Sequence, residues 1–121
     1  MKYLCLVCQE EMKLDAMPKR ELDGMIAEHF AYDETLRRNG HFVVAAALQP
    51  TKTATTVRMR NGKASVTDGP FAETKEQVGG FYLLEARDLN EAIQLAAKIP
   101  SARNGCVEVR PIWELTPPPA T

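Results

Sequence analysis

Apolar residues are grouped along the chain in short blocks that predict a strand, a helix, a strand, a hairpin, a strand, a helix and a last strand. The strands are expected at residues 2–8, 41–48, 81–86 and 106–112, and the helices at residues 18–38 and 89–99. In the second helix, apolar residues recur at the spacing of a helix with one buried face. Without the hairpin the order is βαββαβ, so the sequence predicts an α+β, ferredoxin-like fold.

Turn-forming residues indicate where some of these elements meet. Asn61-Gly62 separates residues 55–60 from residues 63–67. This dipeptide favours the positive φ angles of a type I′ turn, so an inserted β-hairpin is expected there. Asp88, three residues before Glu91, is typical of a capping box at the start of the second helix.

The first strand is apolar on both faces, because side chains alternate between Leu4, Leu6 and Cys8 on one face and Tyr3, Cys5 and Val7 on the other. Two helices cover only one face of such a sheet. The other face needs a second cover, and we therefore expect a homodimer that packs sheet against sheet.

The length and the charge of the chain narrow the classes of function. The 121 residues suit a single domain over residues 1–115, followed by a proline-rich tail over residues 116–121. A net charge of −1 argues against nucleic acid as a partner. The longest apolar run, residues 42–48, is far shorter than the ~20 residues of a membrane helix. A cytoplasmic protein without membrane contact is expected.

The three cysteines do not predict a metal site or a disulfide framework. Cys5 and Cys8 have the spacing of a CxxC motif, but positions three apart on a strand face opposite ways. We therefore interpret both as core thiols. With two histidines in the chain, no metal site and no cofactor are expected.

The first candidate for chemistry is a polar pair on the apolar face of the first helix. His29 and Asp33 are four residues apart, so their side chains are neighbours there. One interpretation is a histidine at the edge of the core whose ring is satisfied by Asp33 or by a backbone carbonyl. The other is a cleft histidine that acts as an acid or a base, since its pKa is naturally close to neutrality.

The second candidate is the segment from Thr67 to Gly80, which is dense in turn formers and charges. Asp68 lies at the end of a strand, where it is either an anchor for a turn or a functional carboxylate. Loops longer than a hairpin requires often carry function. Tyr32 at the edge of the helical apolar face, and Arg110 beside Glu108 on the last strand, are further candidates to line a cleft.

Residues 67–115, TDGPFAETKEQVGGFYLLEARDLNEAIQLAAKIPSARNGCVEVRPIWEL, resemble the signature half of the YCII-related proteins of the DGPF type. The opening MKYLCLV and the hairpin TATTVRMRNGK are also similar to that family, so the resemblance covers nearly the whole chain. It implies a ferredoxin-like α+β fold that dimerises into an α/β barrel.

The resemblance also implies a site. In the wider family a histidine–aspartate dyad lines a cleft, and it has been proposed as an acid/base site. His29 and Asp68 match this dyad as catalytic residues, while Tyr32, Asp33, Phe71 and Arg110 are expected to contact a small organic substrate. One branch is linked to elimination chemistry on chlorinated lactone-like compounds, which implies proton abstraction or elimination. Members encoded beside alternative sigma factors imply the other reading, a non-catalytic ligand-binding or regulatory protein.

Overall fold

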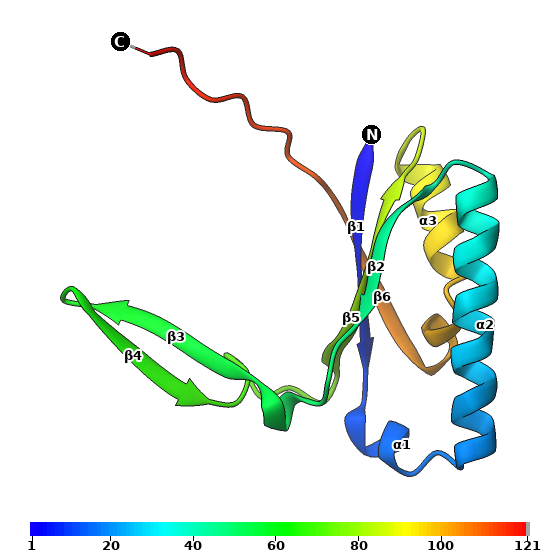
Figure 1. Cartoon of the computed structure of the whole chain (residues 1–121), viewed down its shortest axis with the longest axis horizontal. Helices are drawn as coiled ribbons and strands as arrows, with labels where there is room; N and C mark the ends of the chain where they lie inside the picture. Colours follow the sequence, from blue (N-terminus) through cyan, green and yellow to red (C-terminus); the bar gives the residue numbers. More distant parts are fainter. Residues whose placement is uncertain (121) are drawn as a thin grey trace.

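The computed structural model describes residues 1–120 and shows an α+β domain with an antiparallel four-stranded sheet (Figure 1). The strand order β2-β5-β1-β6 is compatible with a ferredoxin-like fold. The sheet is built from β1 (Lys2–Gln9), β2 (Phe42–Ala47), β5 (Gln77–Glu85) and β6 (Gly105–Pro111).

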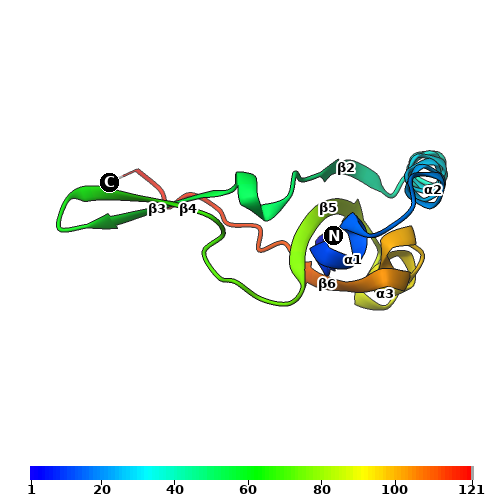
Figure 2. The ribbon, with the colours of Figure 1, turned by 90° about the horizontal axis from the view of Figure 1, so that it is seen from below.

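Two helices cover one face of this sheet, α2 (Lys19–Arg38) and α3 (Leu89–Ala97), as both views show (Figures 1 and 2). The side chains of β1 that face the helices are buried, whereas those on the opposite face are only half-buried. The core therefore lies between the sheet and the helices, around the fully buried Cys5, Leu36, Leu84 and Ile99. We call the uncovered side of the sheet its open face.

The ends of the helices follow the expected local chemistry. The side chain of Asp88 accepts a hydrogen bond from the backbone N–H of Glu91 at 2.9 Å and caps α3. The carboxylate of Glu91 accepts from the N–H of Arg87 at 2.8 Å, one residue earlier than a capping box requires. Gly40, with a φ of 77°, ends α2 in the left-handed conformation that glycine adopts easily.

The predicted hairpin forms a separate two-stranded sheet, β3 (Thr55–Arg60) and β4 (Lys63–Asp68). Asn61 and Gly62 have φ angles of 51° and 75°, as a type I′ turn requires, so this prediction is confirmed. The hairpin extends away from the four-stranded sheet on the side opposite the helices (Figures 1 and 2). We call it the arm.

The structure adds three features that the sequence pattern did not predict. A short helix α1 (Glu11–Asp15) follows β1, and its residue Glu11 accepts two hydrogen bonds from Thr51 at the base of the arm, at 2.7 and 2.8 Å. β5 begins at Gln77, four residues earlier than expected. The last feature is a 3-10 turn over Pro100–Asn104 that leads into β6.

The last part of the chain, residues 112–120, has no regular secondary structure and extends from the domain (Figure 1). It includes most of the predicted tail over residues 116–121, whose final residue, Thr121, lies outside the described part of the chain. Within residues 1–120, none of the helices combines the length and the apolar character that crossing a membrane requires.

Candidate functional site

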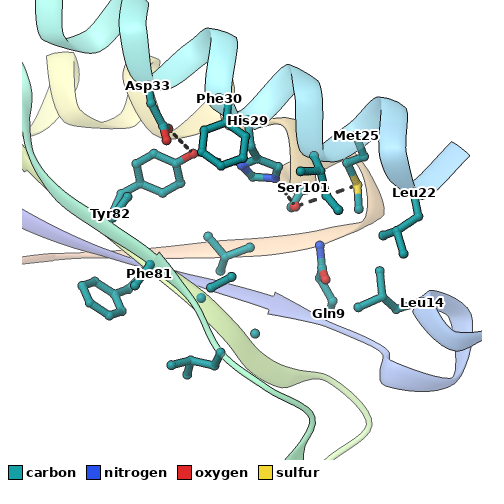
Figure 3. Close-up of a pocket in the computed structure, with 18 residues that line it drawn as sticks. Gln9, Leu14, Leu22, Met25, His29, Phe30, Asp33, Phe81, Tyr82 and Ser101 are labelled. Atoms are coloured by element: carbon teal, nitrogen blue, oxygen red, sulfur yellow. Dashed lines mark hydrogen bonds between the residues drawn. The ribbon is translucent and has the colours of Figure 1, made fainter. Parts of the chain in front are cut away.

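A cavity of about 360 Å³ lies between α2 and the helix-covered face of the sheet (Figure 3). This volume is at the lower end of the range for small-molecule sites. Most of its wall is apolar and comes from α2, β2 and β5, with Leu14 of α1 added. Five polar side chains also reach it: Gln9, His29, Asp33, Tyr82 and Ser101.

His29 is held between two hydroxyl groups from distant parts of the chain. Its Nδ1 lies 2.9 Å from the hydroxyl oxygen of Tyr82, and its Nε2 lies 2.6 Å from Oγ of Ser101. The Tyr82 hydroxyl in turn donates to Oδ1 of Asp33 at 2.8 Å. Four polar groups therefore form one continuous chain along the cavity (Figure 3).

The direction of these hydrogen bonds follows from counting protons. The phenol of Tyr82 has one proton and donates it to Asp33, so its oxygen accepts the N–H from Nδ1 of His29. A neutral imidazole carries one N–H, which leaves a lone pair on Nε2. That lone pair accepts the hydroxyl proton of Ser101. The order of donation is Ser101 to His29 to Tyr82 to Asp33.

Burial sets the charge state of this group of side chains. It lowers the pKa of His29 below the ordinary value of 6.5, against the opposite effects of Asp33 and Glu28. The ring is thus neutral at pH 7, with Nε2 able to take up a proton. Burial, reinforced by the hydrogen bond to Asp33, raises the pKa of the Tyr82 hydroxyl, which therefore stays protonated.

The side chains come together because three elements meet at this point. On α2, helical periodicity places Met25, His29 and Asp33 on the face that contacts the sheet. On β5, alternation points Tyr82 toward the helices, and Tyr82 is 4% exposed. Ser101 is supplied by the 3-10 turn that begins at Pro100.

Of the six site residues that the sequence suggested, His29 and Asp33 line the cavity. They do not bond to each other but are linked through Tyr82. Tyr32 lies on the same helix, and its hydroxyl donates to the carbonyl of Leu95 in α3 at 2.6 Å. Sequence reasoning missed Tyr82 and Ser101, since no local motif marks either residue.

The remaining three lie elsewhere in the protomer. Asp68 is the last residue of β4, exposed and paired with Thr55 in the arm. Phe71, in the loop that follows, is 82% exposed. Arg110 is an exposed residue of β6 that forms an ion pair with Glu108. None of these three is among the residues that line the cavity within one copy of the chain.

Within the described residues 1–120, no group of three or more His, Cys, Asp or Glu side chains is arranged to hold a metal ion. The polar groups that line the cavity are one imidazole, one carboxylate, one amide and two hydroxyl groups.

The fold and the cavity define a class of protein, a small α+β domain with one antiparallel sheet, one helical layer and a cavity between them. Comparison with known sequences is more specific. The pattern of the YCII-related domain matches residues 1–116. An uncharacterised protein of Rhizobium meliloti (strain 1021) is 37% identical over 114 residues, which cover 93% of this chain and 92% of that protein. The chain belongs to the YCII-related family.

Proposed function

We propose that the cavity binds a small organic molecule and that His29 acts there as a general base. The observation that carries this proposal is the polarity of the hydrogen-bond chain, which directs the Nε2 lone pair of His29 toward Ser101. In acid/base catalysis by histidine, one ring nitrogen exchanges the proton while a hydrogen bond to the other nitrogen orients the ring. His29 has this arrangement.

In the proposed reaction, an acidic C–H or O–H of the ligand gives its proton to Oγ of Ser101 while the hydroxyl proton of Ser101 moves to Nε2 of His29. The imidazolium that forms is stabilised by its Nδ1–H bond to Tyr82 and by the negative charge of Asp33 beyond it. The electron pair left on the ligand is either delocalised or expels a leaving group, which makes the step a proton abstraction or an elimination.

The wall of the cavity suggests the shape of the ligand. Leu14, Leu22 and Ile26 offer an apolar surface beside the polar chain. Gln9, which is 9% exposed, extends from β1 toward α2 and faces the same space (Figure 3). We infer a ligand with an apolar body and one carbonyl or acidic head, the head lying between Gln9 and Ser101.

The test is base-catalysed exchange in heavy water. Purified protein is incubated with a panel of small ketones and 1,3-dicarbonyl compounds that bear apolar substituents, and loss of the α-proton signal is followed by NMR. We expect exchange faster than the buffer rate, abolished in His29→Gln and retained in the surface control His41→Gln. Equal rates with and without protein for the whole panel would contradict the general-base function.

One observation favours a second candidate, a non-catalytic ligand-binding protein. Within residues 1–120, every fully buried side-chain nitrogen and oxygen already has a hydrogen-bond partner. A closed network of this kind is also what a stable binding pocket needs. The test is binding of an apolar anionic dye, 8-anilinonaphthalene-1-sulfonate. Equal binding to wild type and His29→Gln, together with no proton exchange in the assay above, would favour this candidate. A regulatory role in a sigma-factor pathway and a cytoplasmic location stay expectations from the sequence.

We also propose that the protein is a homodimer, because the protomer leaves two apolar surfaces uncovered. One is the middle of the open face, on the central strands β5 and β1, where Leu4, Leu6 and Leu83 are only half-buried. The other is one side of the arm, where Val57, Met59 and Val66 are 60%, 60% and 64% exposed. A two-stranded hairpin is marginally stable alone. A second copy would cover both surfaces. Because Asp68 does not line the cavity of its own chain, the predicted pairing of His29 with Asp68 would need Asp68 of the second copy.

A further inference from the structure

Two cysteines far apart in the sequence lie side by side at one edge of the sheet. Cys8 of β1 and Cys106 of β6 are register partners in the antiparallel ladder. Cys8 is half-buried and Cys106 is exposed, and both are on the open face. β6 is an edge strand, and the charged Glu108 and Arg110 follow Cys106 on the same face. This edge is therefore the polar rim of the open face.

The spacing of an antiparallel ladder suits a bond between these two sulfurs. Residues directly opposite each other have Cα atoms about 4.5 to 5.5 Å apart. Disulfides are found with Cα separations of roughly 4.4 to 6.8 Å. Both side chains point to the open face, and the proximity of Cys106 is, after burial, one of the causes that raise the pKa of the Cys8 thiol.

The third cysteine is an internal comparison. Cys5 lies on the opposite face of β1, it is 0% exposed, and burial raises the pKa of its thiol to about 11. With no exposed surface Cys5 cannot meet an oxidant, and its raised pKa lowers the fraction of the reactive thiolate further, so this thiol is expected to be inert. Any chemistry of the cysteines is therefore expected at Cys8 and Cys106 alone.

We propose that Cys8 and Cys106 form a redox-active dithiol that hydrogen peroxide converts into an intramolecular disulfide. The sulfur of Cys106, the exposed partner, attacks one peroxide oxygen. The O–O bond breaks, one water leaves, and Cys106 becomes a sulfenic acid. The sulfur of Cys8 then attacks the sulfur of Cys106, and the S–O bond breaks to release a second water. Two thiols are oxidised and one peroxide is reduced to two waters. A dithiol reductant reverses the bond.

This inference rests on the strand register and the exposure of two thiols, and it does not depend on the chemistry of the cavity. A bond between β1 and β6 closes most of the chain into a loop, and closing a loop stabilises a fold by restricting the unfolded state. The oxidised protein should therefore have a higher Tm than the reduced protein.

The experiment uses the full chain in its folded state. Reduced, folded protein is treated with equimolar hydrogen peroxide and is then unfolded in guanidinium chloride, so that every remaining thiol can be capped with N-ethylmaleimide before digestion with trypsin. We expect the peptide that contains Cys5 and Cys8 to be linked to the peptide that contains Cys106, with Cys5 capped. Free thiols should fall from three to one per chain. Unchanged thiols, or a bond that joins Cys106 of two chains, would overturn the proposal.

Two variants identify the partners. In Cys8→Ser, Cys106 should stop at the sulfenic acid, which dimedone traps, and no link should form. In Cys106→Ser, peroxide should leave Cys5 and Cys8 unmodified. A link that persists in Cys8→Ser would mean that Cys5 is the partner, and it would overturn the assignment.

Phenylarsine oxide gives a readout that needs no oxidant, because one arsenic binds two neighbouring thiols. We expect about one equivalent bound to the folded wild-type chain and none to either variant. Failure of the folded wild-type chain to bind it would show that the sulfurs are too far apart. Binding of the arsenical without any peroxide-induced link would overturn the redox step.

Discussion

His29 and Asp33, one turn apart on α2, do not bond to each other but share the hydroxyl of Tyr82, which lies 2.9 Å from Nδ1 of His29 and 2.8 Å from Oδ1 of Asp33. This hydroxyl fixes which nitrogen of the ring carries the proton. The carboxylate therefore acts on the imidazole through a residue of the sheet, and the geometry of the base depends on how α2 packs against β5.

Removing this hydroxyl should be costly. Tyr82→Phe keeps the ring in the core but leaves a ring N–H of His29 and an oxygen of Asp33 without a partner. An unsatisfied buried polar group costs about 1–3 kcal/mol, so we expect the free energy of unfolding to fall by about this amount. Tyr32→Phe is the matched control, since it removes one hydroxyl bond to a single backbone carbonyl. Urea unfolding of both variants measures the difference, and a smaller loss in Tyr82→Phe than in Tyr32→Phe would contradict the shared role of the hydroxyl.

The lowered pKa of His29 predicts how stability depends on pH. The unfolded chain binds a proton at His29 near pH 6.5, whereas the folded chain binds it only at lower pH. The stabilising contribution of the neutral ring is thus fully present above pH 6.5 and is lost as the pH falls from 6.5 toward the folded pKa. Urea unfolding between pH 7.5 and pH 5 should show a smaller loss of stability in His29→Gln than in wild type. A slope in His29→Gln that is parallel to that of wild type would refute the shift.

Local patterns predicted the parts of the molecule that are decided within one element. The apolar periodicity of α2 placed His29 and Asp33 on its inner face, and the turn at Asn61-Gly62 and the cap at Asp88 follow from backbone preferences of a few residues. The sequence did not predict α1, because a helix of five residues is too short to show a helical periodicity. The sequence placed the start of β5 too late, because Gly79-Gly80 lies near that start and glycine is depleted in strands.

The site depends on long-range packing that such patterns do not encode. Tyr82 and Ser101 are 53 and 72 residues from His29, and nothing near either residue signals the contact. In β5 both Phe81 and Tyr82 are aromatic, and only the pairing of the sheet decides which of them faces the helices. The pairing of Cys8 with Cys106 likewise follows from the register of the sheet. The sequence compared Cys8 only with Cys5 and interpreted both as core thiols, which the structure confirms for Cys5 but not for Cys8, a half-buried residue of the open face.

Two glycines with opposite surroundings test the packing of the backbone. A Cβ at Gly105 would lie 1.9 Å from the carbonyl oxygen of Cys8, so Gly105→Ala must move β6 away from β1. We expect a loss of about 3 kcal/mol, the upper end of the usual cost of overpacking, or failure to fold. Gly24 lies inside α2 with nothing within 4 Å of the added Cβ. Gly24→Ala should therefore stabilise the protein by roughly 0.5–1 kcal/mol through helix propensity. Thermal unfolding compares the two, and tolerance of Gly105→Ala would contradict the close approach of these strands.

The arm offers the sharpest test of the dimer, because adjacent residues of β4 point to opposite sides. Val66 is paired with Val57, and Ala64 with Met59, so these four share one apolar side. Ser65 is paired with Arg58 on the other, polar side. If a second copy covers the apolar side, Val66→Glu buries an unpaired carboxylate in the interface, whereas Ser65→Glu adds an exposed charge opposite Arg58.

Sedimentation equilibrium at micromolar concentration separates these outcomes. Wild type and Ser65→Glu should both sediment as dimers, and Val66→Glu should be largely monomeric. A two-fold symmetric interface contains each substitution twice. Even a loss of about 1.5 kcal/mol for each buried valine then amounts to roughly 3 kcal/mol, which weakens the dimer about a hundredfold. A wild-type chain that sediments as a monomer would refute the dimer itself. A dimer that survives Val66→Glu unchanged would show that the arm stays outside the interface, and it would leave the open face as the surface that a second copy covers.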